Sequence, residues 1–323
     1  MRFIAGLFTI SFLLTSRMTL AALPEDLYTV TGVQGGVVVQ VGCGTGEEML
    51  GLAASAAYLV QGLEPDAAKV AAVRAMLLDQ GVYGSVSVRH WPHAHLPYAD
   101  NMVNLLVSED LGAIEMAEVF RVLCPYGVAY VQRNGEWKKF RKPYPDTMDE
   151  WTHYLHDADG NAVAQDTQVG QPSHVQWMGG PKTARSHEHL GSVSAVVSAR
   201  GRVFYIADDG PIASIALPPK WALTARDAFN GMLLWKRDIG PWEGDLRGFR
   251  SGPSEIPRRL VAVGDEVYVT LGYGKPVTAL DAATGRTLRT YEATQDALEM
   301  VCADGLLYVL TGKMDAAKLA EAI

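Results

Sequence analysis

Apolar and polar residues alternate in two different patterns along this chain, one in its first part and one in its second. In the first part, short apolar runs alternate with longer segments in which apolar residues recur every three or four positions. This alternation of strand and helix patterns is typical of a parallel sheet that helices cover on both faces. The runs predict a strand at 37–41, a second strand that ends at residue 64, and further strands at 86–90, 105–107 and 128–131. The segments between them predict helices at 46–58, 66–80 and 115–123.

The segment 66–80 carries the clearest helix signals. Asp66 can cap its start, and Gly81 can stop it. Between them Val70, Val73 and Leu77 recur at the spacing of one helix face. The sequence therefore predicts a helix that packs this face against the sheet.

A glycine turn joins the first predicted strand to the first predicted helix. Gly42, Gly44 and Gly46 alternate with Cys43 and Thr45 in this turn. Glycines allow a sharp turn and a close approach of the backbone to a ligand, and the N-terminus of the next helix offers free N–H groups. A carboxylate at the end of the following strand, here Glu64, can hold ribose hydroxyls. This unit therefore predicts a site for a cofactor that contains adenosine.

The second part of the chain is repetitive. A turn followed by a strand occurs at 201–206, 265–269 and 304–309, and the stretch 227–235 recurs at 281–288. Asn-Gly and Thr-Gly turns between apolar strands are typical of β-hairpins. A period near 40 residues with short strands indicates blades of a β-propeller.

Three stretches of the first part resemble the class I S-adenosylmethionine-dependent methyltransferases. They are Val41-Gly42-Cys43-Gly44-Thr45-Gly46, Leu96-Pro97-Tyr98-Ala99-Asp100-Asn101 and Arg121-Val122-Leu123-Cys124-Pro125-Tyr126-Gly127, in the order that the family has. The resemblance implies a Rossmann-like sheet and S-adenosylmethionine as cofactor. By the same resemblance, Gly42, Gly44 and Gly46 would cradle the methionine part and Glu64 would bind the ribose.

The chain departs from this family at three positions that usually carry a carboxylate. They are Gln40, two residues before the first glycine, Pro92, four residues before the Leu-Pro-Tyr motif, and Asn104, at the start of the fourth strand. Gln40 can still form hydrogen bonds in the cofactor site but cannot offset positive charge. In addition, nothing after Val131 resembles the last two strands of a complete methyltransferase sheet.

The repeats of the second part resemble the blades of quinoprotein-type propellers, the family of pyrroloquinoline-quinone dehydrogenases and of the outer-membrane assembly lipoprotein. The pattern Asp-Ala-x-x-Gly that opens at Asp227 and Asp281 carries this resemblance. The family has seven or eight blades, and this chain holds about three, which suggests a truncated propeller. We expect no pyrroloquinoline quinone here, because the family binds it on the axis of a complete ring.

Composition and the N-terminal segment indicate which partners and which cellular location to expect. A formal net charge of −8 argues against a nucleic-acid partner. Three widely spaced cysteines predict neither disulfides nor a zinc site. Residues 1–22 contain an arginine, an apolar run and small residues that could be cleaved, which predicts a signal peptide and an exported protein without a membrane span.

Several histidines invite a metal-binding interpretation. His90, His93 and His95 lie close in sequence, and His153 and His156 could combine with the set His187, Glu188 and His189. Asp157, Asp159 and Asn161 alternate as in calcium loops, but the glycine is misplaced and the expected glutamate is missing. We predict no metal site, and interpret these residues as exposed loops and capped turns.

The predicted architecture is an α/β Rossmann-like methyltransferase sheet followed by an all-β partial β-propeller. The segments are a signal peptide at 1–22, the methyltransferase-like domain at 24–135, a linker at 136–194 and the propeller segment at 195–323. The leading hypothesis is methyl transfer from S-adenosylmethionine to an unidentified small molecule, with catalytic residues unknown. The alternatives are a non-enzymatic scaffold that binds a protein partner through the propeller, and a fragment of a quinone-linked oxidoreductase.

Overall fold

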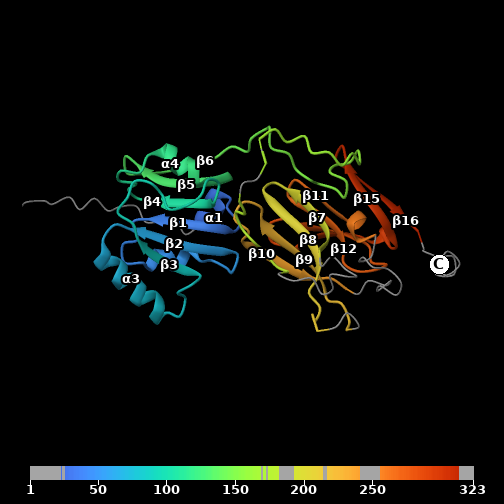
Figure 1. Cartoon of the computed structure of the whole chain (residues 1–323), viewed down its shortest axis with the longest axis horizontal. Coiled ribbons are helices and arrows are strands. Elements are labelled where there is room, and N and C mark those ends of the chain that lie inside the picture. The colour runs from blue at the N-terminus through green and yellow to red at the C-terminus, as the bar shows by residue number, and fades with distance from the viewer. Residues whose placement is uncertain are drawn as a thin grey trace, which may run out of the picture.

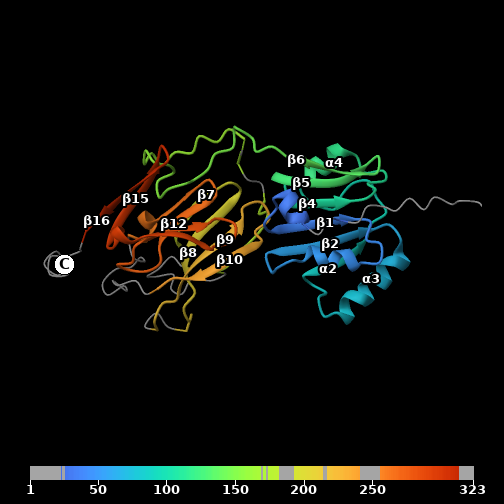
Figure 2. The ribbon, with the colours of Figure 1, turned by 180° about the vertical axis from the view of Figure 1, so that it is seen from behind.

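The computed structural model describes residues 23, 26–168, 170–171, 174–181, 193–213, 217–240 and 255–312. Figure 1 shows two units side by side, an α/β unit in blue and green and an all-β unit in yellow to red. The reverse view in Figure 2 shows the same arrangement from behind.

The first unit is built on a six-stranded sheet with the order β3-β2-β1-β4-β5-β6. The strands β1 to β5 run parallel, and β6 runs antiparallel to β5. This confirms the expected Rossmann-like sheet. The bounds are β1 (Gly36–Val41), β2 (Tyr58–Glu64), β3 (Val86–His90), β4 (Val103–Ser108), β5 (Leu123–Arg133) and β6 (Glu136–Arg141).

Helices cover both faces of this sheet, and they are α1 (Leu27–Thr31), α2 (Glu47–Leu52), α3 (Ala67–Asp79) and α4 (Met116–Val122). Val38 of β1 packs into one buried cluster with residues of α2 and α3. Val39 packs into the other cluster, with residues of α4, because successive side chains of a strand point to opposite faces. The helix predicted at 66–80 is confirmed, and Asp66 caps it by accepting the N–H groups of Ala68 and Lys69.

The helix predicted at 46–58 is too long, because α2 ends at Leu52 and β2 already begins at Tyr58. The Tyr28 hydroxyl donates a hydrogen bond to the Leu52 carbonyl, at the point where the helix ends. The Tyr58 ring stacks on Tyr28 with 4.3 Å between ring centroids. Tyr28 is remote in sequence, so the local helix pattern could not reveal this end.

The strand β6 lies inside the segment that we expected to be linker. It pairs with β5 from Arg133 to Val128, and the rings of Tyr130 and Trp137 stack at 5.0 Å. The sequence showed no sign of the last two strands of a complete methyltransferase sheet, and the structure adds one strand, β6, beyond β5. Charged residues occupy most of β6, as is common for a strand at a sheet edge, and this hid the strand from a search for apolar runs.

The second unit contains two four-stranded antiparallel sheets and a hairpin, which is the arrangement expected for the opening blades of a propeller. The first sheet consists of β7 (Val193–Ala199), β8 (Arg202–Asp208), β9 (Trp221–Asp227) and β10 (Leu233–Asp238). The second consists of β11 (Leu260–Val263), β12 (Glu266–Thr270), β13 (Val277–Asp281) and β14 (Thr287–Tyr291). The hairpin is formed by β15 (Ala297–Ala303) and β16 (Leu306–Thr311), and the 3₁₀ turns η1 (Ile256–Arg259) and η2 (Glu292–Thr294) precede β11 and β15.

Tryptophans join one sheet to the next. The Trp235 indole N–H donates to the Ala282 carbonyl at 2.9 Å, and a Cβ on Gly285 would lie 2.6 Å from the indole ring. Trp177 makes the same contacts one sheet earlier, donating to Ala228 at 2.9 Å and covering Gly231. Trp177, a residue of the expected linker, therefore packs on a turn of the first sheet in the same way that Trp235 of β10 packs on a turn of the second sheet.

The stretch 151–153 of the linker crosses the first strand of each blade. The carbonyls of Trp151 and Thr152 accept the N–H groups of Ser198 in β7 at 2.6 Å and Ala262 in β11 at 2.9 Å. In β15, the Cys302 N–H donates to Nε2 of His153 at 3.0 Å. A ring nitrogen that accepts a hydrogen bond carries no proton, so His153 is neutral here, and burial lowers its pKa accordingly.

The other linker residues that we considered as metal ligands also have structural partners. His156 is buried and contacts the Asp149 carboxylate at 2.7 Å, while Asp157 and Asp159 accept backbone N–H groups of their own turn. Within the ranges described, no group of three histidine, cysteine or acidic side chains could hold a metal ion. His187, Glu188 and His189 lie outside the described residues.

Candidate functional site: the carboxyl edge of the first sheet

The candidate site lies where the strand order of the first sheet reverses. β1 lies between β2 and β4, so the chain leaves β1 toward one side and returns on the other. In open α/β sheets the crevice beyond the carboxyl ends of such strands is where ligands bind. Here the glycine turn follows β1, Glu64 ends β2 and Glu109 follows β4.

The glycine turn is open at two of its three glycines. Gly42, Gly44 and Gly46 all have positive φ, at 80°, 51° and 87°. A Cβ added to Gly42 or Gly44 would meet nothing within 4 Å, and both residues are exposed. A Cβ on Gly46 would instead lie 2.7 Å from Val73 of α3. Gly42 and Gly44 therefore offer backbone to a ligand, whereas Gly46 lets α2 and α3 approach.

Glu64, at the end of β2, stabilises this turn through hydrogen bonds. Its side chain is buried, and its carboxylate accepts the N–H of Cys43 at 3.0 Å and the N–H of Asp66 at 3.1 Å. A carboxylate has about four lone-pair positions, so acceptor capacity remains for ribose hydroxyls. Burial and the neighbouring Glu64 raise the pKa of the Cys43 thiol to about 12, which fits a small packed residue and not a nucleophile.

Gln40 leaves a buried acceptor unsatisfied beside the turn. The residue is buried, its amide nitrogen donates to Glu48 at 3.1 Å, and its Oε1 has no hydrogen-bond partner. An unmet buried acceptor costs free energy, so such an atom points to a donor that arrives with a ligand. The ammonium group of a bound amino acid is a donor of the right charge for Oε1 and Glu48 together.

Two carboxylates at this edge were not identified from the sequence. Glu48 lies in the first turn of α2, where acids suit the helix dipole. Glu109 follows β4, and burial together with the charge of Glu48 raises its pKa. Glu48 therefore places negative charge beside Gln40, whose own amide carries none, and Glu109 interacts in turn with Glu48. The signal that could have found Glu109 is its position directly after a strand at the carboxyl edge.

Arg121 holds the Leu-Pro-Tyr loop in place beside the site. Its guanidinium donates to the Tyr98 carbonyl at 2.9 Å, to the Leu96 carbonyl at 3.2 Å and to the Asp100 carboxylate at 2.7 Å. It also pairs with Glu118, whose pKa this hydrogen bond lowers to about 2. The second and third motifs therefore occur together because one arginine joins them.

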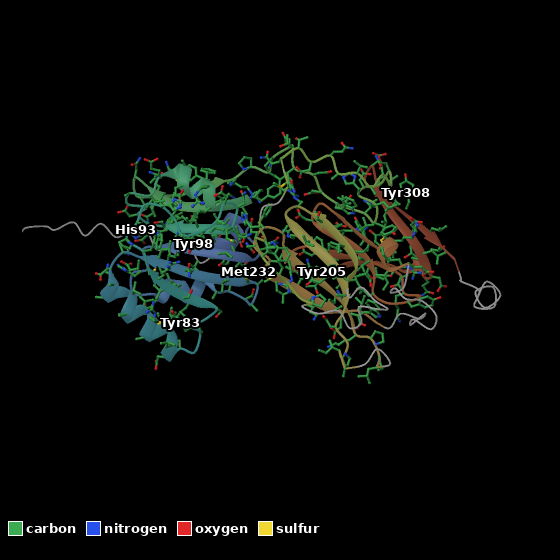
Figure 3. The ribbon with its side chains drawn as sticks, viewed as in Figure 1. Tyr83, His93, Tyr98, Tyr205, Met232 and Tyr308 are labelled. Carbon is green, nitrogen blue, oxygen red and sulfur yellow. The ribbon has the colours of Figure 1, made fainter. Side chains whose placement is uncertain are left out.

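The three histidines of this loop have three separate partners. His90 contacts the Pro65 carbonyl at 2.8 Å, and His95 contacts Glu118 at 3.0 Å. The His93 ring lies edge-on to Trp91 at 4.9 Å, and Figure 3 labels it on the side of the unit that faces away from the second unit. The structure therefore does not bring them together, and exposed Pro92 lies between Trp91 and His93.

Asn104 belongs to the opposite edge of the sheet. Its Oδ1 accepts the Val37 N–H at 2.8 Å and the Asn230 side-chain amide at 2.7 Å. Its Nδ2 donates to the buried Asp227 carboxylate at 2.7 Å, in the turn that opens the first blade repeat. An aspartate at position 104 would face Asp227 with a like charge. This departure from the methyltransferase pattern therefore serves the contact with the second unit.

Comparisons with known proteins agree with both resemblances. Residues 39–131 match the family model described as a methyltransferase domain, and residues 219–322 match the model described as the outer membrane protein assembly factor BamB. The first part of the chain is therefore similar to methyltransferase domains and the second to that assembly factor. No curated protein matches the chain.

Three solved structures are each similar to about a third of this chain. An S-adenosylmethionine-dependent methyltransferase from Aquifex aeolicus is 18% identical over 34% of this chain and 66% of its own, with a TM-score of 0.31. Geranyl diphosphate C-methyltransferase from Streptomyces coelicolor A3(2), in complex with Mg²⁺, geranyl diphosphate and S-adenosyl-L-homocysteine, is 18% identical over 33% of this chain and 43% of its own, with a TM-score of 0.30. The [4+2]-cyclase SpnF is 25% identical over 33% of this chain and 43% of its own, with a TM-score of 0.29. This chain thus spans less than two thirds of the length of each.

Proposed function

We propose that the carboxyl edge of the first sheet binds S-adenosylmethionine and that the protein transfers a methyl group to a small-molecule acceptor. The observation that carries the proposal is the buried, unpartnered Oε1 of Gln40 beside the open glycines Gly42 and Gly44. When bound, the cofactor supplies an activated methyl group on a sulfonium. The match of residues 39–131 to a methyltransferase domain supports the same assignment.

Each residue of the edge has a role in this proposal. The backbone at Gly42 and Gly44 approaches the methionine part, and Gln40 with Glu48 accepts its ammonium group. Glu64 accepts the ribose hydroxyls with the lone pairs that the turn leaves free. The carboxylates of Glu48 and Glu109 offset the positive charge that Gln40 cannot. Catalysis then rests mainly on positioning an acceptor in line with the methyl group.

Titration calorimetry of the full chain with S-adenosylmethionine tests the cofactor claim. We expect Glu64→Gln to weaken binding by about tenfold, or about 1.4 kcal/mol, because the neutral amide loses acceptor capacity toward the ribose. Glu47→Gln is the matched control, since it removes the same charge from an exposed residue of α2. Equal weakening by both variants, or no heat from the unmodified protein at millimolar cofactor, contradicts the proposal.

The rival hypothesis is a scaffold that binds without transferring a methyl group. The neutral Gln40 in place of a carboxylate is the observation in its favour. Transfer of radiolabel from methyl-labelled cofactor to extracted small metabolites distinguishes the two, because a scaffold binds the cofactor and transfers no label. The quinone-linked oxidoreductase stays a prediction from the second resemblance.

Export is a further part of the proposal. Residues 1–22, the expected signal peptide, lie outside the described residues, and the match of residues 219–322 to an outer membrane assembly factor supports export. None of the helices described here has the length and apolar character needed to cross a membrane. We expect the N-terminal sequence of the mature protein to begin near residue 23, and retention of Met1 would contradict export.

A further inference from the structure

A cavity of about 430 Å³ opens between the two units, at the amino edge of the first sheet. The first unit contributes Asn104, Tyr126 and Arg141 to its lining, and the second contributes Arg200 and Phe229. Met232, which Figure 3 labels at the boundary of the two units, belongs to the same turn as Phe229. Cavities of this size between domains are common places for small ligands.

The charged groups that line this cavity are three arginines and three aspartates. The guanidinium of Arg141 lies 5.4 Å from the centroid of the Tyr126 ring, and that of Arg200 lies 5.3 Å from it. The third arginine, Arg202, joins Arg200 in binding the Asp265 carboxylate, at 3.1 and 2.7 Å. Two separate guanidinium groups therefore already hold one carboxylate at this cavity, each through one charge-assisted hydrogen bond.

The remaining carboxylates in the lining are committed to their own turns. Asp227 accepts the N–H groups of Phe229 and Asn230 as well as the Asn104 amide. Asp281 likewise accepts N–H groups of its own turn, at residues 283 and 284. In contrast, the Arg141 side chain donates through Nε to the Tyr126 carbonyl, and no carboxylate among the described residues pairs with its terminal nitrogens. Positive charge is therefore left unmatched on one side of the cavity.

Tyr126 adds an independent sign of function. Its φ is 65°, in the left-handed region that residues other than glycine rarely adopt. Such strain persists where the surrounding structure requires it, and it is concentrated at ligand clamps and active sites. Here the strained backbone holds the Tyr126 ring close to two arginines that come from different units, and the Tyr144 ring stacks on it at 5.0 Å.

We propose that this cavity binds a small organic carboxylate, with the carboxylate held by Arg141 and Arg200 and the apolar body against Phe229 and Leu234. Leu234 and Phe229 are half-buried, and both line the cavity. The site lies at the end of the sheet opposite to the glycine turn and uses none of its residues. Its existence therefore does not depend on the proposed methyl transfer.

Titration calorimetry of the full chain with benzoate as probe tests this site. We expect saturable binding, at least about tenfold weaker binding of uncharged benzamide, and a similar loss in Arg141→Gln, because each removes one side of the ion pair. Inorganic phosphate should bind more weakly than benzoate, because it has no apolar body. The matched control is Arg289→Gln, since Arg289 also lies over a tyrosine, Tyr291, but outside the cavity.

Several results would overturn the proposal. The first is an absence of saturable benzoate binding up to about 10 mM, a concentration well above the dissociation constant expected for such a site. The others are benzamide binding as tight as that of benzoate, phosphate binding as tight or tighter, and an unchanged benzoate affinity in Arg141→Gln. Circular dichroism establishes that each variant is folded. Should Arg141→Gln fail to fold, Arg141→Lys replaces it, and we expect weaker benzoate binding because lysine lacks the planar fork.

Discussion

The two edges of the first sheet differ in how their polar groups are satisfied. At the amino edge, the Asn104 amide is hydrogen-bonded on both sides, to Val37 of its own sheet and to Asp227 and Asn230 of the second unit. At the carboxyl edge, Gly42 is exposed and Oε1 of Gln40 is buried without a partner. One edge is completed by another part of the same chain, whereas the other keeps an unsatisfied buried acceptor, where we propose that a ligand binds.

Because of this difference, two departures from the methyltransferase pattern that look alike in sequence have different structural causes. Asn104 and Gln40 both replace a carboxylate by an amide. At Asn104 the amide is needed, because its N–H group meets the buried Asp227 carboxylate. At Gln40 the lost charge is restored nearby, since its amide nitrogen contacts Glu48. The Asn104 amide is therefore no evidence against the cofactor site, and the contact with Glu48 weakens the argument that Gln40 gives to the scaffold hypothesis.

The largest effect should follow from restoring a carboxylate at the amino edge. Asn104→Asp places a second acid against Asp227, whose pKa burial already raises. We expect the free energy of unfolding at pH 7.5 to fall by about 2–4 kcal/mol, measured by urea denaturation. A raised carboxyl pKa means that stability is lost as pH rises through it, so the deficit should shrink as the pH falls toward 5.

The double variant Asn104→Asp with Asp227→Asn is the control for this prediction. It exchanges the two groups, so that an amide again faces a carboxylate and the hydrogen bond can form in the opposite direction. We expect it to recover most of the lost stability, as expected for residues in direct contact. If the double variant is no more stable than Asn104→Asp alone, the contact between the units does not carry the effect.

At the carboxyl edge, a substitution of Gln40 should weaken cofactor binding while it leaves the stability of the fold nearly unchanged. Gln40→Met removes the unmet acceptor while nearly preserving side-chain volume. The gain from removing that atom and the loss of the contact with Glu48 are each about 1 kcal/mol, so the free energy of unfolding should change by less than about 1 kcal/mol. S-adenosylmethionine binding should weaken by about tenfold, because the ammonium group loses an acceptor.

The measurements are urea denaturation and calorimetry on the same preparation. Gln61→Met serves as control, because Gln61 is a half-buried amide of β2 whose Oε1 is already satisfied by the Tyr98 hydroxyl at 2.6 Å. It should lose stability and leave cofactor affinity nearly unchanged. Unaltered affinity in Gln40→Met would show that Oε1 does not face the ligand.

The sequence predicted those parts of the fold that local patterns determine. The α3 helix was found with its cap at Asp66 because the cap, the apolar face and the stop all lie within it. The end of α2 was missed because Tyr28, which contacts it, lies 24 residues away along the chain. The role of Trp177 was missed for the same reason, since its partner turn at Gly231 comes much later in the chain.

The candidate site shows the same limit. Gly42, Gly44 and Glu64 were predicted because strand, turn and acid follow one another in a fixed order. Glu48 and Glu109 were not, because their relation to Gln40 depends on how α2 and β4 are placed beside β1. The meaning of Asn104 depends on a turn more than a hundred residues later, at Asp227.

The smallest effect should come from Glu109 at the carboxyl edge. Burial and the charge of Glu48 raise the pKa of Glu109, so the folded state disfavours its charged form. A raised pKa means that stability falls as pH rises through it. Glu109→Gln should therefore increase the free energy of unfolding at pH 7 by a few tenths of a kcal/mol, and the gain should vanish toward about pH 3, below the ordinary pKa of a glutamate, where the carboxyl is protonated in both states.

Cofactor binding should change in the opposite direction in this variant. Removing one negative charge near the cationic cofactor should weaken S-adenosylmethionine binding by about two- to threefold at low salt, and by less at high salt, because ions screen the charge. The control is Asp110→Asn, which removes the same charge from the next, exposed residue of the chain. Unchanged or tighter binding in Glu109→Gln would show that Glu109 does not face the cofactor. An equal loss in Asp110→Asn would show that only overall charge acts at this edge.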